Sequence, residues 1–182
     1  MKEICVFLAD GFEEIEAITP IDILRRGELP VKTVSIMSTK TVMGTHGVPL
    51  IADITLRELK EEDVEMIVLP GGLPGAFHLA ENEQLGELVT KFVKAGKPVA
   101  AICAAPIVLG RRGLLEGKNA TCYPGMEEEL IGAHCTGAMV EKTDHLIFGK
   151  GPAAAAAFAF AILERYADAS VVAGLKKGML WE

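Results

Sequence analysis

The chain has 182 residues, of which 50% are hydrophobic and 24% charged, a composition that supplies a folded core and is not typical of a disordered chain. Its formal net charge of −7 would repel a phosphate backbone, and no basic run is interleaved with aromatic residues, so we expect no nucleic-acid partner. The apolar runs fall short of the roughly 20 residues that span a bilayer, and the N-terminal sequence lacks a signal-peptide pattern, so we expect a cytosolic protein with no membrane partner.

The first half of the chain alternates between two kinds of segment. Apolar runs rich in β-branched residues predict strands, and amphipathic segments between them predict helices. Strands that read as continuous apolar runs are typical of a parallel sheet covered by helices on both faces. The predicted strands cover residues 4–9, 31–37, 64–70 and 98–103, and the two clearest helices cover residues 13–27 and 82–96.

Other segments add to this alternation. Residues 40–53 and 138–151 each hold two short β runs around a turn, which predicts two hairpins added to the sheet. A short helix is expected after Pro124, and the run that begins at Pro152 is too apolar to face water, which predicts a buried helix. No linker divides the chain, so we expect one domain, 1–182, with an α/β doubly wound sandwich fold.

Cys103 lies where the strand at 98–103 gives way to small residues. Functional sites in open α/β sheets lie beyond the carboxyl ends of the strands, and a tight strand-to-helix turn there presents a nucleophile among backbone amides. The start of the following helix would lower the pKa of the thiol. The alternative is a cysteine that only fills the core, because free cysteine is among the most buried residue types.

The sequence gives little sign of other cysteine chemistry or of a cofactor. The four cysteines form no C-x-x-C pair, and in a reducing compartment we expect no disulfide. No pair of ligands has the spacing of a zinc site, so we expect no metal. The turn Pro70–Gly72 allows close approach to a ligand, but "GGLPGA" lacks the dinucleotide-binding spacing, so we expect no cofactor.

Three glutamates follow the first predicted strand. Glu13 and Glu14 fit the first turn of a helix, where carboxylates complement the helix dipole. If Ile15 and Ile18 pack inward, Glu16 lies at the border of that face, close to a neighbouring strand end. Partial burial would raise the pKa of Glu16 and make it an acid/base partner for a thiolate.

The histidines offer no clear partner for a cysteine nucleophile. His46 and His145 fall in the predicted hairpins, His78 in a helical stretch and His134 after the segment "EEELIG". We expect none of them to be a catalytic base.

Four segments together resemble one family. They are "FLADGFEEIEAITPIDILRR", "IVLPGGLPGA", "VAAICAAP" and "GKGPAAAAAFAFAILE", in that order. They closely resemble the ThiJ/PfpI superfamily, in the branch of the parkinsonism-associated protein deglycase and its bacterial relatives. Ala104 stands where the protease-like branch has a histidine, which favours the deglycase branch. The resemblance implies a flavodoxin-like sandwich, a homodimer and no cofactor.

The resemblance also implies roles for individual residues. Cys103 would be a nucleophile of low pKa, and Glu16 its protonated hydrogen-bond partner. The backbone amides of Gly72 and Ala104, with Gly71 in the same turn, would form an oxyanion site. In several relatives a histidine faces the cysteine, but the matching segment "TCYPG" places Tyr123 there. Tyrosine donates a hydrogen bond but is no neutral base near pH 7, since its pKa is ordinarily about 10.

The neighbouring Cys122 raises a further possibility. A second thiol beside Tyr123 would lie close enough to the site to resolve a sulfenic acid on the nucleophile.

We therefore expect a cofactor-independent glyoxalase or protein deglycase that acts on small aldehydes such as methylglyoxal, or on glycated side chains. The alternative is a redox sensor or stress chaperone that uses the same cysteine without turnover. A cysteine peptidase or amidotransferase would need a positioned histidine.

Overall fold

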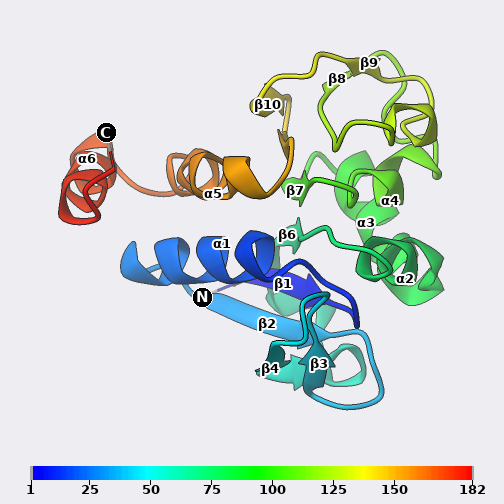
Figure 1. Cartoon of the computed structure of the whole chain (residues 1–182), viewed down its shortest axis with the longest axis horizontal. Coiled ribbons are helices and arrows are strands. Elements are labelled where there is room, and N and C mark those ends of the chain that lie inside the picture. The colour runs from blue at the N-terminus through cyan, green and yellow to red at the C-terminus, as the bar shows by residue number, and fades with distance from the viewer. Residues whose placement is uncertain (1, 182) are drawn as a thin grey trace.

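The computed structural model describes residues 2–181, in which a seven-stranded sheet runs in the order β10-β11-β7-β6-β1-β2-β5. Every neighbouring pair in this sheet is parallel except β10 and β11, which are antiparallel. Figure 1 shows the sheet between two layers of helices. The predicted α/β doubly wound, mostly parallel architecture is confirmed.

The elements have the following bounds. The strands are β1 (Glu3–Leu8), β2 (Val31–Ser35), β3 (Thr41–Met43), β4 (Pro49–Ile51), β5 (Ile54–Thr55), β6 (Val64–Leu69), β7 (Val99–Ile102), β8 (Asn119–Ala120), β9 (His134–Cys135), β10 (Val140–Thr143) and β11 (Leu146–Gly149). The α-helices are α1 (Glu14–Arg26), α2 (Gly75–Glu81), α3 (Glu83–Lys94), α4 (Ile107–Gly110), α5 (Ala155–Leu163) and α6 (Ala169–Gly178). Short 3₁₀ turns cover Leu56–Glu58, Glu61–Asp63, Glu127–Glu129 and Pro152–Ala154.

The central strands form the core because both of their faces are covered. Every residue of β7 is buried, and β6 and β1 are buried almost throughout. Helices α1 and α5 pack together on one face of the sheet, and α2, α3 and α4 pack together on the other (Figure 1). The continuous apolar runs of the sequence thus correspond to strands buried on both sides.

Helix α1 buries a different face from the one that the sequence predicted. Ile15 and Ile18 are 53% and 43% exposed, whereas Glu16, Ala17 and Ile23 are fully buried. The expected inward packing of the two isoleucines is therefore wrong. The reason is that Glu16 itself points into the protein, where a backbone amide binds its carboxyl group.

The two hairpins behave differently. β10 and β11 turn at Asp144 and join the main sheet, as expected, with β11 parallel to β7. β3 and β4 also pair antiparallel, but they form a small sheet of their own instead of extending the main one. A short β-bridge between Phe12 and Gly44 places this hairpin beside the start of α1.

The C-terminal part of the chain forms α5 and α6. After a 3₁₀ turn at Pro152, α5 is largely buried, as its composition predicts. α6 extends away from the sheet in Figure 1, and the Trp181 ring packs 5.6 Å from that of Phe160. Among the helices of residues 2–181, none has the length and apolarity needed to cross a membrane.

Candidate active site

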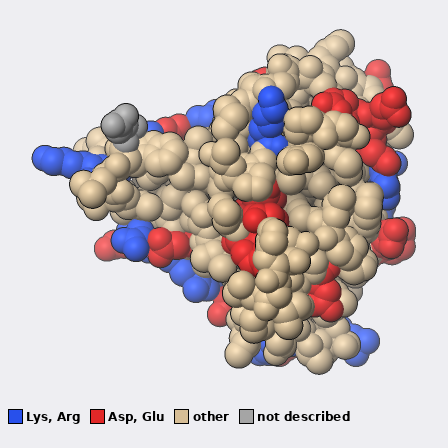
Figure 2. Space-filling model, in the orientation of Figure 1, with Lys and Arg blue, Asp and Glu red and all other residues tan. Residues whose placement is uncertain are grey.

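Three strand ends meet at one edge of the sheet. β6 lies between β1 and β7, and all three run in the same direction, so the segments that follow them lie side by side. The segment after β1 leads into α1, the segment after β6 contains Gly71 and Gly72, and β7 ends at Cys103. In Figure 2 acidic side chains gather in the hollow at the centre of the face shown, near the start of α1.

The backbone of Cys103 holds a left-handed conformation. Its φ angle is +65°, a value that costs a non-glycine residue about 1 kcal/mol or more. Two hydrogen bonds fix this turn: the Cys103 amide donates to the Gly149 carbonyl at 2.8 Å, and the Tyr123 amide donates to the Cys103 carbonyl at 2.8 Å. Strained residues of this kind cluster at functional sites. The predicted sharp turn after β7 is therefore present, and Cys103 is only 7% exposed.

Glu16 is bound to the turn after β6. Its Oε2 accepts a hydrogen bond of 2.9 Å from the Gly71 amide, and its side chain is fully buried. Its other oxygen, Oε1, is buried and has no hydrogen-bond partner among the described residues. The carboxyl group lies next to the Cys103 thiol, and each of the two groups shifts the pKa of the other. A Cβ atom on Gly71 would lie 2.7 Å from both Glu16 Oε2 and Cys103 Cβ, so only glycine fits between them.

Glu13 fixes the start of α1 relative to the same turn. Its amide donates to the Gly71 carbonyl at 2.9 Å, and its Oε2 accepts from the Glu16 amide at 2.8 Å. The side chain of Glu13 is thus the N-cap of α1, in agreement with the predicted role at the helix start. Together with the bond from Gly71 to Glu16, this leaves little freedom for the buried carboxyl group.

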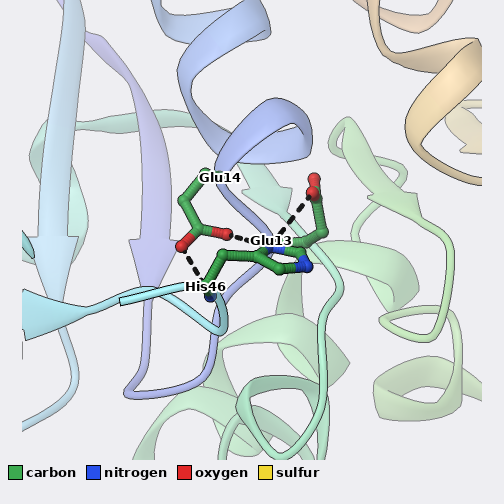
Figure 3. A group of neighbouring side chains, drawn as sticks. All are labelled: Glu13, Glu14 and His46. Carbon is green, nitrogen blue, oxygen red and sulfur yellow. Dashed lines mark hydrogen bonds and ion pairs between the residues drawn. The ribbon is translucent and has the colours of Figure 1, made fainter. Parts of the chain in front are cut away.

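Glu14 holds the loop between β3 and β4. Its carboxylate accepts from the His46 amide at 2.7 Å and lies 2.8 Å from His46 Nδ1, as Figure 3 shows together with Glu13. The pKa of Glu14 is lowered: burial alone would raise it, but the hydrogen bonds from His46 and the local amides outweigh that effect. Within residues 2–181, Glu13, Glu14 and His46 are the only group whose side-chain ligand atoms converge as a metal would require. Here they bind one another and the loop.

Burial shifts the acidity of both groups in the Cys103–Glu16 pair. Burial, and to a smaller extent the charge of Glu13, raises the pKa of Glu16 to about 7. The sequence also predicted a raised pKa for this residue. Burial, followed by the charge and hydrogen bond of Glu16, raises the pKa of Cys103 to about 12. The low thiol pKa that we expected is therefore not found. The helix invoked for it, α4, begins only at Ile107 and has four residues, too short for a substantial dipole.

Two backbone amides oppose the rise in the pKa of the Cys103 thiol. Hydrogen bonds from the Gly72 and Ala104 amides lower the pKa of Cys103. Gly72 has a φ angle of +90°, and a Cβ atom there would collide with the Glu13 amide nitrogen, so the turn needs glycine. Both amides that the sequence singled out thus lie close enough to the sulfur to lower the pKa of the thiol. The pair can hold a single negative charge either as a carboxylate beside a thiol or as a thiolate beside a carboxylic acid.

Tyr123 contacts the site through its backbone. Its side chain is 50% exposed, and its ring lies against Gly151, where a Cβ atom would be 3.4 Å from Cδ2. The ring also lines a cavity of about 200 Å³ together with Met139 and Pro152. The catalytic role suggested for the tyrosine hydroxyl stays a prediction, because the bond that joins this residue to Cys103 comes from its amide.

Among the described residues, no hydrogen bond joins a histidine to Cys103. His78 Nδ1 lies 2.9 Å from the Asp10 carbonyl, His46 binds Glu14, and His134 is exposed on β9. Sequence reasoning did not single out Gly149, whose carbonyl holds the Cys103 amide. The only signal for it was the glycine-rich segment "GKGP" at the end of the second hairpin.

A model of the DJ-1/PfpI family matches residues 2–165. The chain belongs to this family. Its relatives include DJ-1 homolog B of Arabidopsis thaliana, which is 38% identical over 90% of this chain. The matched region covers only 38% of the length of that relative. The glutathione-independent glyoxalase DJR-1.2 of Caenorhabditis elegans is 36% identical over 84% of this chain and 81% of its own length. A protein named as a deglycase from Pyrococcus abyssi is 34% identical over 71% of this chain and 77% of its own.

Solved structures agree with this membership. The crystal structure of a cysteine-to-alanine mutant of a DJ-1 superfamily protein from Salmonella typhimurium has a TM-score of 0.94 and 34% identity, and each chain is covered completely. DJ-1beta of Drosophila melanogaster has a TM-score of 0.93 and 34% identity, with 100% of this chain and 98% of the other covered. The flavodoxin-like sandwich that the resemblance implied is thus confirmed.

Proposed function

We propose that this DJ-1/PfpI protein is a cofactor-independent glyoxalase or protein deglycase that acts on methylglyoxal-type α-oxoaldehydes or their early adducts on side chains. The observation that carries the proposal is the buried pair of Cys103 and Glu16, beside which the Gly72 and Ala104 amides lower the pKa of the thiol. Relatives named as a glyoxalase and a deglycase support the same reaction class.

In the proposed first step, the Cys103 thiol adds to the aldehyde carbon. Glu16 in its carboxylate form takes the thiol proton as the S–C bond forms, and a pKa of about 7 suits it to this role near neutral pH. The carbonyl oxygen becomes an oxyanion, which the Gly72 and Ala104 amides stabilise. Glu16 then returns its proton to that oxygen, which gives a neutral hemithioacetal.

The adduct then rearranges and leaves. Glu16 removes the hydrogen of the former aldehyde carbon as a proton and passes it to the adjacent carbonyl oxygen, so an enediol forms. Glu16 then takes the proton of the hydroxyl group on the first carbon and delivers it to the second carbon, which converts the enediol into a thioester of a hydroxy acid. Water hydrolyses this thioester, which releases the hydroxy acid and restores the thiol, so the net reaction adds one water to the oxoaldehyde.

The test is turnover of methylglyoxal without glutathione by the full chain and by single variants. Cys103→Ala should lose activity by more than about 100-fold, and Glu16→Gln by at least about 10-fold. The wild-type kcat/KM should rise with pH through about 7 as Glu16 loses its proton, and Glu16→Gln should lose this rise. Cys135→Ser, which changes an exposed cysteine outside the pair, is the matched control and should keep full activity.

Full turnover by Cys103→Ala would sink the proposal. The same two amides also suit the oxygens of a cysteine sulfinate, so a redox sensor is the second candidate. That alternative is favoured if mild peroxide converts Cys103 to sulfinic acid, read by mass spectrometry, while the protein consumes negligible methylglyoxal.

We also propose that the chain forms a homodimer through α1 and the β3–β4 hairpin. Ile15 and Ile18 on α1 are exposed, and so are Val48 and Ile51 on the hairpin. The bonds from Glu14 to the loop between β3 and β4 place these apolar side chains on neighbouring elements. Large exposed apolar patches are typical of association surfaces.

A further inference from the structure

Two cysteines outside the Cys103 site lie together. β8 and β9 pair in parallel, with Ala120 opposite Cys135, and Cys122 follows two residues after Ala120. The side chains of Cys122 and Cys135 line one cavity of about 330 Å³, which does not include Cys103 in its lining, and each thiol shifts the pKa of the other. Cys122 is buried, with 4% exposure, whereas Cys135 is exposed.

We propose that Cys122 and Cys135 form a second redox site, which closes into an intrachain disulfide when a hydroperoxide oxidises it. The Cys103 thiol takes no part in this reaction. The second redox site also gives Cys122 a different partner from the one that the sequence suggested, since Cys122 and Cys135 line the same cavity.

The chemistry balances as follows. A hydroperoxide oxidises the Cys135 sulfur to a sulfenic acid, and the hydroperoxide is reduced to its alcohol, or to water if it is hydrogen peroxide. The Cys122 sulfur then attacks the Cys135 sulfur, the S–S bond forms, and the hydroxyl group leaves with the Cys122 proton as water. Two thiols and one hydroperoxide thus give one disulfide, one alcohol and one water.

The surroundings favour this order of events. Cys135 is the exposed thiol, so an oxidant meets it first. The hydrogen bond from Cys122 opposes the effects of burial and of the Glu127 charge on the pKa of Cys135. The same cavity is lined by Thr121, a fully buried residue whose hydroxyl has no hydrogen-bond partner, which leaves it free to bind an oxygen held on sulfur.

The environment also sets the speed of the reaction. Burial, together with the charges of Cys135 and Glu127, raises the pKa of Cys122 to about 12, and burial raises that of Cys135. Few thiolates are therefore present at neutral pH, and the oxidation should accelerate as the pH rises.

The disulfide would also affect the backbone turn at Cys103, because Cys122 is covalently joined to Tyr123. Cys122 directly precedes Tyr123, whose amide holds the Cys103 carbonyl at 2.8 Å. Closing the S–S bond draws the segment before Tyr123 toward β9, so oxidation of the second site acts on the bond that fixes the strained residue.

The experiment uses the full chain with Cys103→Ala, so that oxidation of Cys103 cannot contribute. This protein is treated with hydrogen peroxide at about pH 8, denatured, alkylated and mapped by mass spectrometry. We expect a peptide pair joined through Cys122 and Cys135, the loss of two free thiols together, and their recovery with dithiothreitol. The buried Cys5 should stay reduced as an internal control.

Two variants sharpen the result. Cys135→Ser in the same background changes only an exposed side chain, and it should leave Cys122 fully alkylatable after peroxide. Cys122→Ser should let Cys135 proceed to sulfinic acid or to a disulfide between chains. The proposal is overturned if Cys135 reaches sulfinic acid in the Cys103→Ala chain while Cys122 stays a free thiol. It is equally overturned if disulfides between chains are the sole product.

Discussion

At the scale of single residues, Glu16 links the chemistry of the site to the stability of the fold. Its pKa lies near 7 in the folded protein because the carboxyl group is buried, whereas an exposed glutamate has a pKa near 4.5. The folded state therefore holds a proton that the unfolded state has already lost between these two values. The contribution of Glu16 to the free energy of unfolding is therefore fully present below pH 4.5. It decreases as the pH rises toward 7 and is lost above that value.

This reasoning predicts how Glu16→Gln changes the pH dependence of stability. The glutamine keeps an acceptor for the Gly71 amide but never ionises. The difference in free energy of unfolding between the Glu16→Gln variant and wild type should shift in favour of the variant by about 3 kcal/mol from about pH 4 to pH 8. Urea denaturation at each pH measures this difference. Glu62→Gln, at an exposed position, is the control. A difference between Glu16→Gln and wild type that stays constant with pH would show that the buried carboxyl does not titrate as described.

Gly71 offers a second test at the scale of one residue. Gly71→Ala would place a Cβ atom 2.7 Å from Cys103 Cβ and 2.9 Å from the Ile102 carbonyl oxygen, neither of which moves freely. We expect a stability loss of about 2 kcal/mol and at least about a tenfold loss of aldehyde turnover, because Glu16 and Cys103 must separate.

The matched control for this substitution is Gly174→Ala on α6, where a Cβ atom meets nothing within 4 Å. It should be neutral or stabilising, because alanine favours a helix. Equal effects of the two substitutions would mean that the crowding at Gly71 has no functional importance.

At the scale of secondary-structure elements, the sequence predicted the central strands and the long helices but not their contacts. β1, β6 and β7 read as continuous apolar runs because both faces of each strand are buried almost throughout. The main error lay in α1, where apolar periodicity favoured the side of Ile15 and Ile18. Periodicity could not reveal that the buried face carries a glutamate, because the amide that binds it lies 55 residues further along the chain.

The short elements were the least predictable. β8 and β9 have two residues each and are defined by pairing with one another, which no local pattern encodes. The acidity of Cys103 was mispredicted for a related reason. A helix was expected to follow it directly, but turns occupy residues 103–106, and burial beside Glu16 determines the pKa instead. Motif spacing predicted that these residues meet at one edge of the sheet, but how deeply each of them is buried follows only from the fold.

At the scale of the whole molecule, Ile15 and Ile18 form an exposed apolar side of α1. Because these side chains do not pack in the core, they are available for association with a second chain. Ile18→Glu should convert the proposed dimer to a monomer, as measured by sedimentation velocity, because a buried unpaired charge destabilises an interface by several kcal/mol.

The control for this substitution is Ile131→Glu, since Ile131 is similarly exposed, at 55%, but lies outside α1 and the β3–β4 hairpin. It should leave the oligomeric state unchanged. A wild-type chain that sediments as a monomer at all concentrations would remove the dimer proposal without affecting the proposed reaction.

The left-handed backbone of Cys103 has an evolutionary consequence. Glycine and asparagine are the residues that ordinarily occupy such a conformation, so the fold itself gives cysteine no advantage there. If mutation acted without functional selection, position 103 would drift toward those residues. A lineage keeps cysteine at this turn only as long as selection acts on what its sulfur does.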